Sequence, residues 1–178
     1  SLYVMASTSQ DQASNYNLIS NTISFTYDGT SSTVSITSSV GTYASSSPIY
    51  VTTTFSESVG GFTISDLSIT NGTASDFVAV STTVYTFSVT PSSQGTVVIS
   101  VPANSATDTA GNYNIRSNNV TTTYDSTPPT IAEVTAITTP NSDTTPDYAF
   151  SSTEAGTITY SGSCSATTTA QSGNNTIT

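Results

Sequence analysis

Residues Asp11–Thr30 read DQASNYNLISNTISFTYDGT, and residues Asp108–Thr127 read DTAGNYNIRSNNVTTTYDST. The two stretches align without a gap at a constant offset of 97 positions, which places Asn15 on Asn112. Self-similarity at a fixed period is the signature of a repeat architecture, and this period is about the length of one β-sandwich domain. The chain is therefore expected to be a slice of an array, starting and stopping inside units.

The composition predicts an all-β chain. Ser and Thr make up 72 of the 178 residues, whereas Leu occurs only three times. Val, Ile, Thr, Tyr and Phe supply most of the bulk, and these residues suit a pleated, half-buried surface. Strong helix formers are nearly absent from any window of helical length.

The stretch between the two copies shows the spacing of a sandwich. About eight short apolar runs of period two, separated by turn residues, are typical of an immunoglobulin-like β-sandwich. The dipeptide Asn71-Gly72 between two such runs predicts a hairpin. Val34 and Ile36 alternate with polar residues in one predicted strand, and Tyr85, Phe87 and Val89 share one face of another. The predicted inward row of a third strand is Val97, Ile99 and Val101.

The predicted fold is a set of tandem immunoglobulin-like β-sandwich repeats, one complete and flanked by two partial units. Residues 1–29 are expected to be the last strands of a partial unit, with Ile23–Tyr27 as a half-buried strand. Residues 30–127 form the complete central unit, and residues 128–178 begin a further unit of another subtype. The run Thr127-Pro128-Pro129 is a natural linker, because prolines stiffen an extended connection.

The charge balance is strongly acidic. Eleven carboxylates face a single basic side chain, Arg116, and the formal net charge is −10. Nucleic-acid binding needs a basic surface, so this partner class is excluded, and an anionic membrane surface is disfavoured. Divalent cations are the natural ionic partners, and Arg116 is expected to pair with a nearby carboxylate. No apolar run is long enough to span a bilayer.

Catalysis is not expected. The chain has no His and no Lys, and no basic neighbour in sequence lowers the pKa of Cys164. The carboxylates show no pattern that suggests a glycosidase pair. Cys164, the single cysteine, cannot build an internal disulfide framework.

The repeated turn is a candidate calcium site. Calcium takes six to eight oxygen ligands, which loop carboxylates, amides and carbonyls provide. The alternative is simpler: Asp and Asn satisfy local backbone N–H groups in Asx turns. No cofactor is required, and Ca²⁺ is the one candidate. The candidate ligands are Asp108, Asn112 and Asp125 in the second copy, and Asp11, Asn15 and Asp28 in the first.

Tyr16 and Tyr113 follow the turn in both copies. They either pack over the end of the sandwich or form an exposed surface for adhesion or carbohydrate stacking. Because the chain has no Trp, packing is the favoured role.

Two long stretches carry a family resemblance. Residues Ser47–Phe77 (SPIYVTTTFSESVGGFTISDLSITNGTASDF) and Tyr85–Asn112 (YTFSVTPSSQGTVVISVPANSATDTAGN) resemble the bacterial Ig-like repeats of large surface adhesins. Residues Thr144–Thr178 are similar to a second Ig-like subtype of such proteins. That resemblance implies that the disulfide partner of Cys164 lies beyond Thr178.

Three functions are compatible with this resemblance, and all place the chain outside the cell or on its surface. The favoured function is a structural segment acting as stalk, spacer or adhesive fibre. The second is a filament subunit in which half-domains of neighbouring chains complete one another. Such a composite is expected to lack the positions equivalent to Thr82–Val97, which favours one longer polypeptide. The third is an adhesion module that binds a glycan or a protein.

Overall fold

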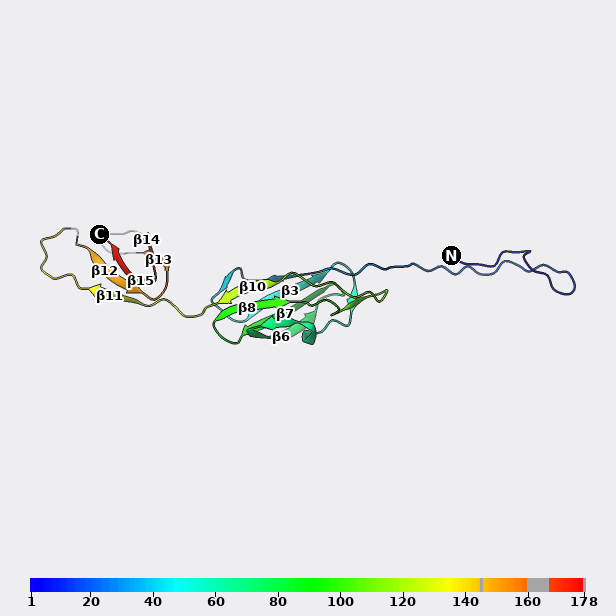
Figure 1. Cartoon of the computed structure of the whole chain (residues 1–178), viewed down its shortest axis with the longest axis horizontal. Coiled ribbons are helices and arrows are strands. Elements are labelled where there is room, and N and C mark those ends of the chain that lie inside the picture. The colour runs from blue at the N-terminus through cyan, green and yellow to red at the C-terminus, as the bar shows by residue number, and fades with distance from the viewer. Residues whose placement is uncertain (145, 160–166, 178) are drawn as a thin grey trace. The chain divides into compact units, whose positions relative to one another are not determined.

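The computed structural model describes residues 1–144, 146–159 and 167–177 (Figure 1). The chain divides into two compact units, Ser1–Asp125 and Ser126–Thr178. Its described residues form strands, turns and one short 3₁₀ helix, η1 (Ile64–Asp66), and they contain no α-helix. The prediction of an all-β chain is therefore confirmed. Cys164 lies outside the described residues.

Two four-stranded sheets face each other in the first unit. Neighbouring strands pair antiparallel, except that Tyr43–Ala44 runs parallel to Val120–Tyr124. Two short strands, β4 (Val59–Gly60) and β9 (Thr107–Asp108), form a separate pair. One sheet has the order β1 (Val34–Ser38), β3 (Ile49–Phe55), β7 (Val84–Pro91), β6 (Gly72–Ala79). The other has the order β2 (Tyr43–Ala44), β10 (Val120–Tyr124), β8 (Gly95–Ser100), β5 (Ser68–Thr70).

The core lies between these sheets and follows the predicted period of two. The predicted inward row Val97, Ile99 and Val101 is fully buried. Aliphatic side chains fill one end of the core, and an aromatic group fills the other end. In that group the ring centroids of Phe55, Phe62 and Tyr85 are 5.0–5.8 Å apart in edge-to-face arrangements, which suit aromatic quadrupoles.

The hairpin predicted at Asn71-Gly72 is wrong. The strands that flank it, β5 and β6, lie in different sheets and do not pair. Asn71 adopts a φ of +57°, and its side-chain amide donates to the carbonyl oxygen of Ser93 (3.0 Å). A Cβ at Gly72 would lie 2.9 Å from Cγ1 of Val89, so a close approach of two strands requires glycine there. The turn therefore carries the chain from one sheet to the other.

The first and last segments of the central unit run side by side in the same direction. Residues 32–44 contact residues 115–125 through backbone hydrogen bonds and through the side chain of Asn118. We call these two segments the terminal clamp. Its bonds are Ile115 N to Ser32 O (3.0 Å), Ile36 N to Asn118 Oδ1 (3.0 Å), Asn118 Nδ2 to Ile36 O (2.9 Å), Thr123 N to Thr42 O (2.8 Å) and Asp125 N to Ala44 O (2.9 Å). The chain therefore enters the sandwich at one end and leaves it at the other.

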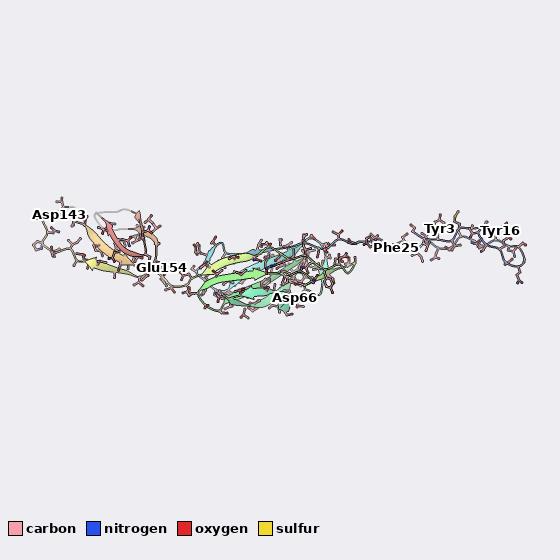
Figure 2. The ribbon with its side chains drawn as sticks, viewed as in Figure 1. Tyr3, Tyr16, Phe25, Asp66, Asp143 and Glu154 are labelled. Atoms are coloured by element: carbon pink, nitrogen blue, oxygen red, sulfur yellow. The ribbon has the colours of Figure 1, made fainter. Side chains whose placement is uncertain are left out.

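Residues 1–27, here called the N-terminal arm, form no regular strand. Isolated bridges join Leu2 to Ile23 and Gln10 to Tyr16. The half-buried strand predicted at Ile23–Tyr27 does not form within this chain by itself, where Phe25 is 79% and Tyr27 is 87% exposed. Figure 2 shows the side chains of Tyr3, Tyr16 and Phe25 extending away from the arm's ribbon. The alternating pattern is present, but no second sheet covers its apolar face.

The second unit contains a three-stranded antiparallel sheet and a separate strand pair. The order β11 (Ile131–Thr135), β12 (Tyr148–Ser152), β15 (Gly173–Ile177) matches the order β1-β3-β7 of the first unit, with the same antiparallel pairings. A strand in the place of β7 is therefore present, although the sequence predicted a gap there. Phe150 is buried in this unit. The separate pair consists of β13 (Gly156–Thr159) and β14 (Thr167–Ala170).

Candidate functional site

The repeated turn in the central unit is closed by its own side chains. Asp108 Oδ1 accepts hydrogen bonds from the backbone N–H groups of Ala110 (2.8 Å) and Asn112 (2.9 Å). Its Oδ2 accepts one from Asn112 Nδ2 (2.9 Å). These bonds, that of the Asn112 side chain first, lower the pKa of the Asp108 carboxyl although burial opposes them. Gly111 supplies the left-handed backbone of the turn, with a φ of +94°.

The first copy of the turn has the same bonds without the burial. Asp11 Oδ1 accepts from the N–H groups of Ala13 (2.8 Å) and Asn15 (3.0 Å), and its Oδ2 accepts from Asn15 Nδ2 (3.0 Å). The pKa of Asp11 is likewise lowered, chiefly by the side chain of Asn15. Ser14 takes the place of Gly111 with a φ of +71°. The sequence of the turn therefore determines its hydrogen bonds whether or not the turn is buried.

A second amide organises each loop. Asn114 is buried, accepts from two backbone N–H groups and donates to two carbonyl oxygens. Asn17 makes the equivalent four bonds in the exposed arm. The partners of Asn114 are Ser105 N, Ala106 N, Pro102 O and Ile115 O, at 2.8–2.9 Å. Those of Asn17 are Thr8 N, Ser9 N, Met5 O and Leu18 O, also at 2.8–2.9 Å.

Three carboxylates converge at the end of the sandwich where the chain enters. One ligand oxygen each from Asp28, Glu57 and Asp108 lies within 4.8 Å of the others. Asp28 precedes β1, and Glu57 follows β3. The pairing of Val59 with Asp108 brings the loop of Glu57 to the repeated turn. We call these three residues the carboxylate cluster.

The cluster is electrostatically unfavourable for the protein alone. Burial raises the pKa of Glu57, and the charges of Asp108 and Asp28 raise it further. The single basic side chain does not relieve this repulsion, because Arg116 Nη2 donates to Asn119 Oδ1 (3.2 Å). The carboxylate partner predicted for Arg116 is therefore replaced by an amide oxygen.

The structure groups the predicted calcium ligands differently from the sequence alignment. Asp28 lies beside Asp108, and its carbonyl oxygen accepts from Asn112 Nδ2 (3.1 Å). Asp125 follows β10 at the other end of the clamp, where its N–H donates to Ala44. Asp11 and Asn15 contact each other within the arm.

Glu57 was missed by the sequence analysis. It has no counterpart in the first copy, because that copy begins at Ser1, which aligns with Val98. A comparison limited to these two copies carries no signal for it, but Glu154 stands 97 positions after Glu57 in the third segment, so a comparison with that segment does.

A calcium ion fits the cluster only in part. Asp108 already accepts three hydrogen bonds, and Asp28 Oδ1 accepts one from the N–H of Thr30 (2.9 Å). Glu57 contributes a third carboxylate, and calcium needs six to eight oxygens. The remaining oxygens would have to come from backbone carbonyls and water. Calcium at this cluster stays a prediction.

The two tyrosines after the turn are both exposed. Tyr16 is 60% and Tyr113 is 55% exposed. The favoured prediction, that they pack over the end of the sandwich, is therefore wrong. Tyr113 pairs with Thr107 through the backbone, which leaves its ring on the surface.

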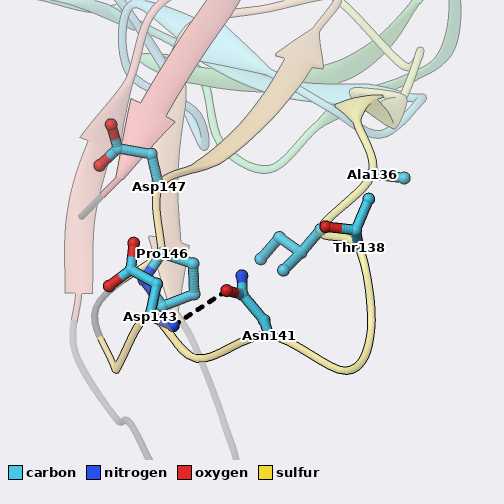
Figure 3. A pocket seen from close by; sticks show the side chains of 7 residues that line it. Ala136, Thr138, Asn141, Asp143, Pro146 and Asp147 are labelled. Carbon is cyan, nitrogen blue, oxygen red and sulfur yellow. Dashed lines mark hydrogen bonds between the residues drawn. The ribbon is translucent and has the colours of Figure 1, made fainter.

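An open hollow lies in the loop between β11 and β12 (Figure 3). The N–H of Asp143 donates to Asn141 Oδ1 (2.9 Å), and Asp147 and Pro146 complete one wall. The facing side of the loop is lined by Ala136, Ile137 and Thr138. This arrangement offers carboxylate and amide oxygens as hydrogen-bond acceptors.

Comparison with known proteins gives a match at the level of the domain family. The family model described as "Bacterial Ig-like domain" matches residues 28–124, which is more than half of the chain. This match covers the sandwich from the carboxylate cluster to the end of β10. No curated protein matches the sequence. Among the described residues, no helix is long and apolar enough to cross a membrane.

Proposed function

The chain belongs to the bacterial Ig-like domain family, and we propose that it is a structural repeat segment of a large secreted or cell-surface protein. In this role it acts as a stalk, spacer or adhesive fibre. The family has a non-enzymatic fold and is typical of extracellular modules. The proposed partners are neighbouring Ig-like repeats in the same or an adjacent chain.

The observation that carries this proposal is the terminal clamp. The chain enters at the end marked by Ser32 and Ile115 and leaves at the end marked by Ala44 and Asp125. A pull on both ends therefore slides residues 32–44 past residues 115–125 along their length. The hydrogen bonds between these segments are loaded together and must break together. This arrangement suits a domain that transmits tension along a stalk.

Asn118 is the side chain on which the clamp depends most. It holds both the N–H and the C=O of Ile36, so its removal takes away two hydrogen bonds of the clamp. We expect Asn118→Ala to lower the force at which the central unit unfolds when the full chain is stretched in single-molecule experiments. Forced unfolding reports the unfolding barrier, so the lower force corresponds to a faster unfolding rate.

The neighbouring residue provides the matched control. The side chain of Asn119 accepts from Arg116 and takes no part in the clamp. Asn119→Ala is expected to leave the unfolding force unchanged. Equal unfolding forces for the wild type and Asn118→Ala would contradict the proposal that the terminal clamp resists the pull.

An adhesive role is the second candidate, and exposed aromatic side chains support it. Tyr16, Tyr113, Tyr43 and Tyr50 are all more than half exposed. Tyrosine presents an apolar ring and a polar hydroxyl, which suits contacts with glycans or proteins. Binding to a glycan array that is lost in a Tyr43→Ser, Tyr50→Ser double variant would support this role. An array without hits would contradict glycan binding.

A further inference from the structure

We propose that the N-terminal arm is the closing hairpin of another Ig-like sandwich, and that its apolar face is covered by a repeat segment equivalent to residues 30–97 of the central unit. This inference rests on the proposed repeat organisation and names the partner of the arm. The covering segment is that of a preceding repeat unit joined to the arm.

The arm already has the local geometry of a closing hairpin. Residues 98–124 are the counterpart of the arm in the central unit. We call residues 98–124 the closing hairpin. Ser20 Oγ accepts from Val4 N (2.8 Å) and donates to Asn21 O, as Ser117 Oγ accepts from Val101 N (2.9 Å) and donates to the next carbonyl. The Asp and Asn bonds of the turn also recur at the same offset. The bridge between Leu2 and Ile23 falls where Ile99 pairs with Val120.

The side chains that form the core in the closing hairpin are exposed in the arm. Leu2 is 71% exposed, whereas its counterpart Ile99 is fully buried. Val4 is 56% exposed, whereas its counterpart Val101 is fully buried. A contiguous exposed apolar face of this kind marks an interaction surface.

Hydrogen-bonding groups that are paired in the closing hairpin are unpaired in the arm, within the part of the chain that the structure describes. In the closing hairpin, Ile115 N, the Asn118 amide and Thr123 N bind residues 32–42. Their counterparts are Leu18 N, the Asn21 amide and Thr26 N, and none of these three finds a partner among the described residues. The free groups are thus the arm's half of a terminal clamp. In the central unit, the strand that pairs with the equivalent groups is residues 32–44, so an equivalent strand would supply their partners.

The structure also defines the chemistry of the missing partner. In the central unit, Ile99 packs in a cluster with Ile36, Val51 and Phe87. Val101 packs with aromatic side chains at the other end of the core. The partner must therefore present branched aliphatic side chains to Leu2 and aromatic ones to Val4. Burial of apolar surface and pairing of the free backbone groups then both stabilise the packing of this partner on the arm.

One position requires the partner to differ from the central unit. Phe25 stands where the central unit has Thr122, whose hydroxyl is buried without a hydrogen-bond partner. A phenyl ring needs more room than this threonine, and overpacking is destabilising. The natural partner is therefore expected to have smaller side chains opposite Phe25 than residues 30–97 provide.

The test is a fusion in which a copy of residues 30–97 is joined directly to Ser1 of the full 178-residue chain. The fusion carries Phe25→Thr, which removes the expected overpacking. We expect the amide hydrogens of Leu18 and Thr26 to exchange at least about 100-fold more slowly than in the unfused chain, because opening then requires unfolding of a sandwich. Adding Val4→Asp to the fusion is expected to restore fast exchange.

Two outcomes would overturn the inference. One is unchanged exchange of the arm in the fusion while the amides of β3 and β7 in the central unit stay protected. The other is seen in the unfused chain: self-association on light scattering that protects Leu18 and Thr26 would mean that a second copy covers the arm. An unfused monomer with a fast-exchanging arm supports the inference. The stretching experiment on Asn118 reports on the central unit alone, so failure of the proposed function is distinguished from failure of this inference.

Discussion

The N-terminal arm and the closing hairpin of the central unit can be compared residue by residue, because they align at an offset of 97 positions. Asn17 and Asn114 make the same four hydrogen bonds, and Asp11 and Asp108 close the same turn. Their surroundings differ, since Asn114 and Asp108 are buried, whereas Asn17 is half-buried and Asp11 is exposed. The turn is therefore a local property of the sequence, whereas burial is contributed by the strands that cover it.

The largest difference between the two copies is expected for a buried charge. Val101→Asp places a carboxylate in the aromatic end of the core, where no cationic partner exists. We expect a loss of at least about 4 kcal/mol of unfolding free energy, enough to unfold the central unit. Val4→Asp should change the stability by no more than about 0.5 kcal/mol, because Val4 is exposed.

Urea unfolding of the full chain, followed by circular dichroism, measures both changes. A comparable loss of stability in Val4→Asp would show that the arm packs onto another part of the chain in solution. The comparison of the two copies would then be wrong at its starting point.

An intermediate difference is expected for the second amide of the loop. Asn114→Ala leaves two backbone N–H groups and two carbonyl oxygens in a partly buried loop without their partner. We expect a loss of about 2–3 kcal/mol in the central unit, because unsatisfied buried groups bear their full desolvation cost. In Asn17→Ala the same groups are exposed to water, so the urea midpoint should not move.

The two variants also separate local order from stability. Asn17→Ala is expected to speed hydrogen exchange at Ser7 and Asn17, whose backbone N–H groups are bonded within the loop. An arm that exchanges equally fast with and without Asn17 would show that its loop is not formed by its own sequence.

The smallest difference concerns the carboxylate cluster, to which the closing hairpin contributes Asp108 while Asp11 of the arm has no such carboxylate neighbours in the described part of the chain. The pKa of Glu57 is raised in the folded state by burial and by Asp108 and Asp28. A raised pKa favours folding below the ordinary value of about 4.3, and this contribution is lost as the pH rises through the folded pKa. Glu57→Gln is therefore expected to raise the melting temperature slightly at pH 7, and the gain should vanish below about pH 4.

Added calcium is expected to reverse the difference in melting temperature between the wild type and Glu57→Gln. If the cluster binds Ca²⁺, the wild type melts at a higher temperature as calcium is added, because the ion binds the folded state. Glu57→Gln should lose most of that rise, while Asp11→Asn in the arm should keep it. A calorimetric titration without any shift in the wild type would contradict the calcium prediction.

Much of the sandwich could be predicted because its strands alternate cleanly. Tyr85, Phe87 and Val89 were expected on one face and are buried. Asn71-Gly72 misled the prediction, because a dipeptide suited to a tight turn does not reveal whether the next strand joins the same sheet. Ile23–Tyr27 misled it because alternation marks a face suited to burial without showing that a partner covers it.

The candidate site likewise combines contacts that could be predicted from the sequence with contacts that only the fold creates. The bonds between Asp108 and Asn112 span four residues, and an Asx turn is visible in the sequence. Glu57 and Asp28 lie far from Asp108 in the chain, and the pairing of β4 with β9 brings Glu57 to it. No local pattern predicts such a meeting.

The all-β class and the 97-residue period follow from composition and self-similarity alone, and the hydrogen bonds between Asp and Asn in each turn follow from residues four positions apart. The burial of Val101 against the exposure of Val4, the placement of β5 and β6 in different sheets and the meeting of Glu57 with two aspartates arise only in the folded chain. These features depend on strands distant in sequence, whose association is driven by burial of apolar surface rather than by local preference.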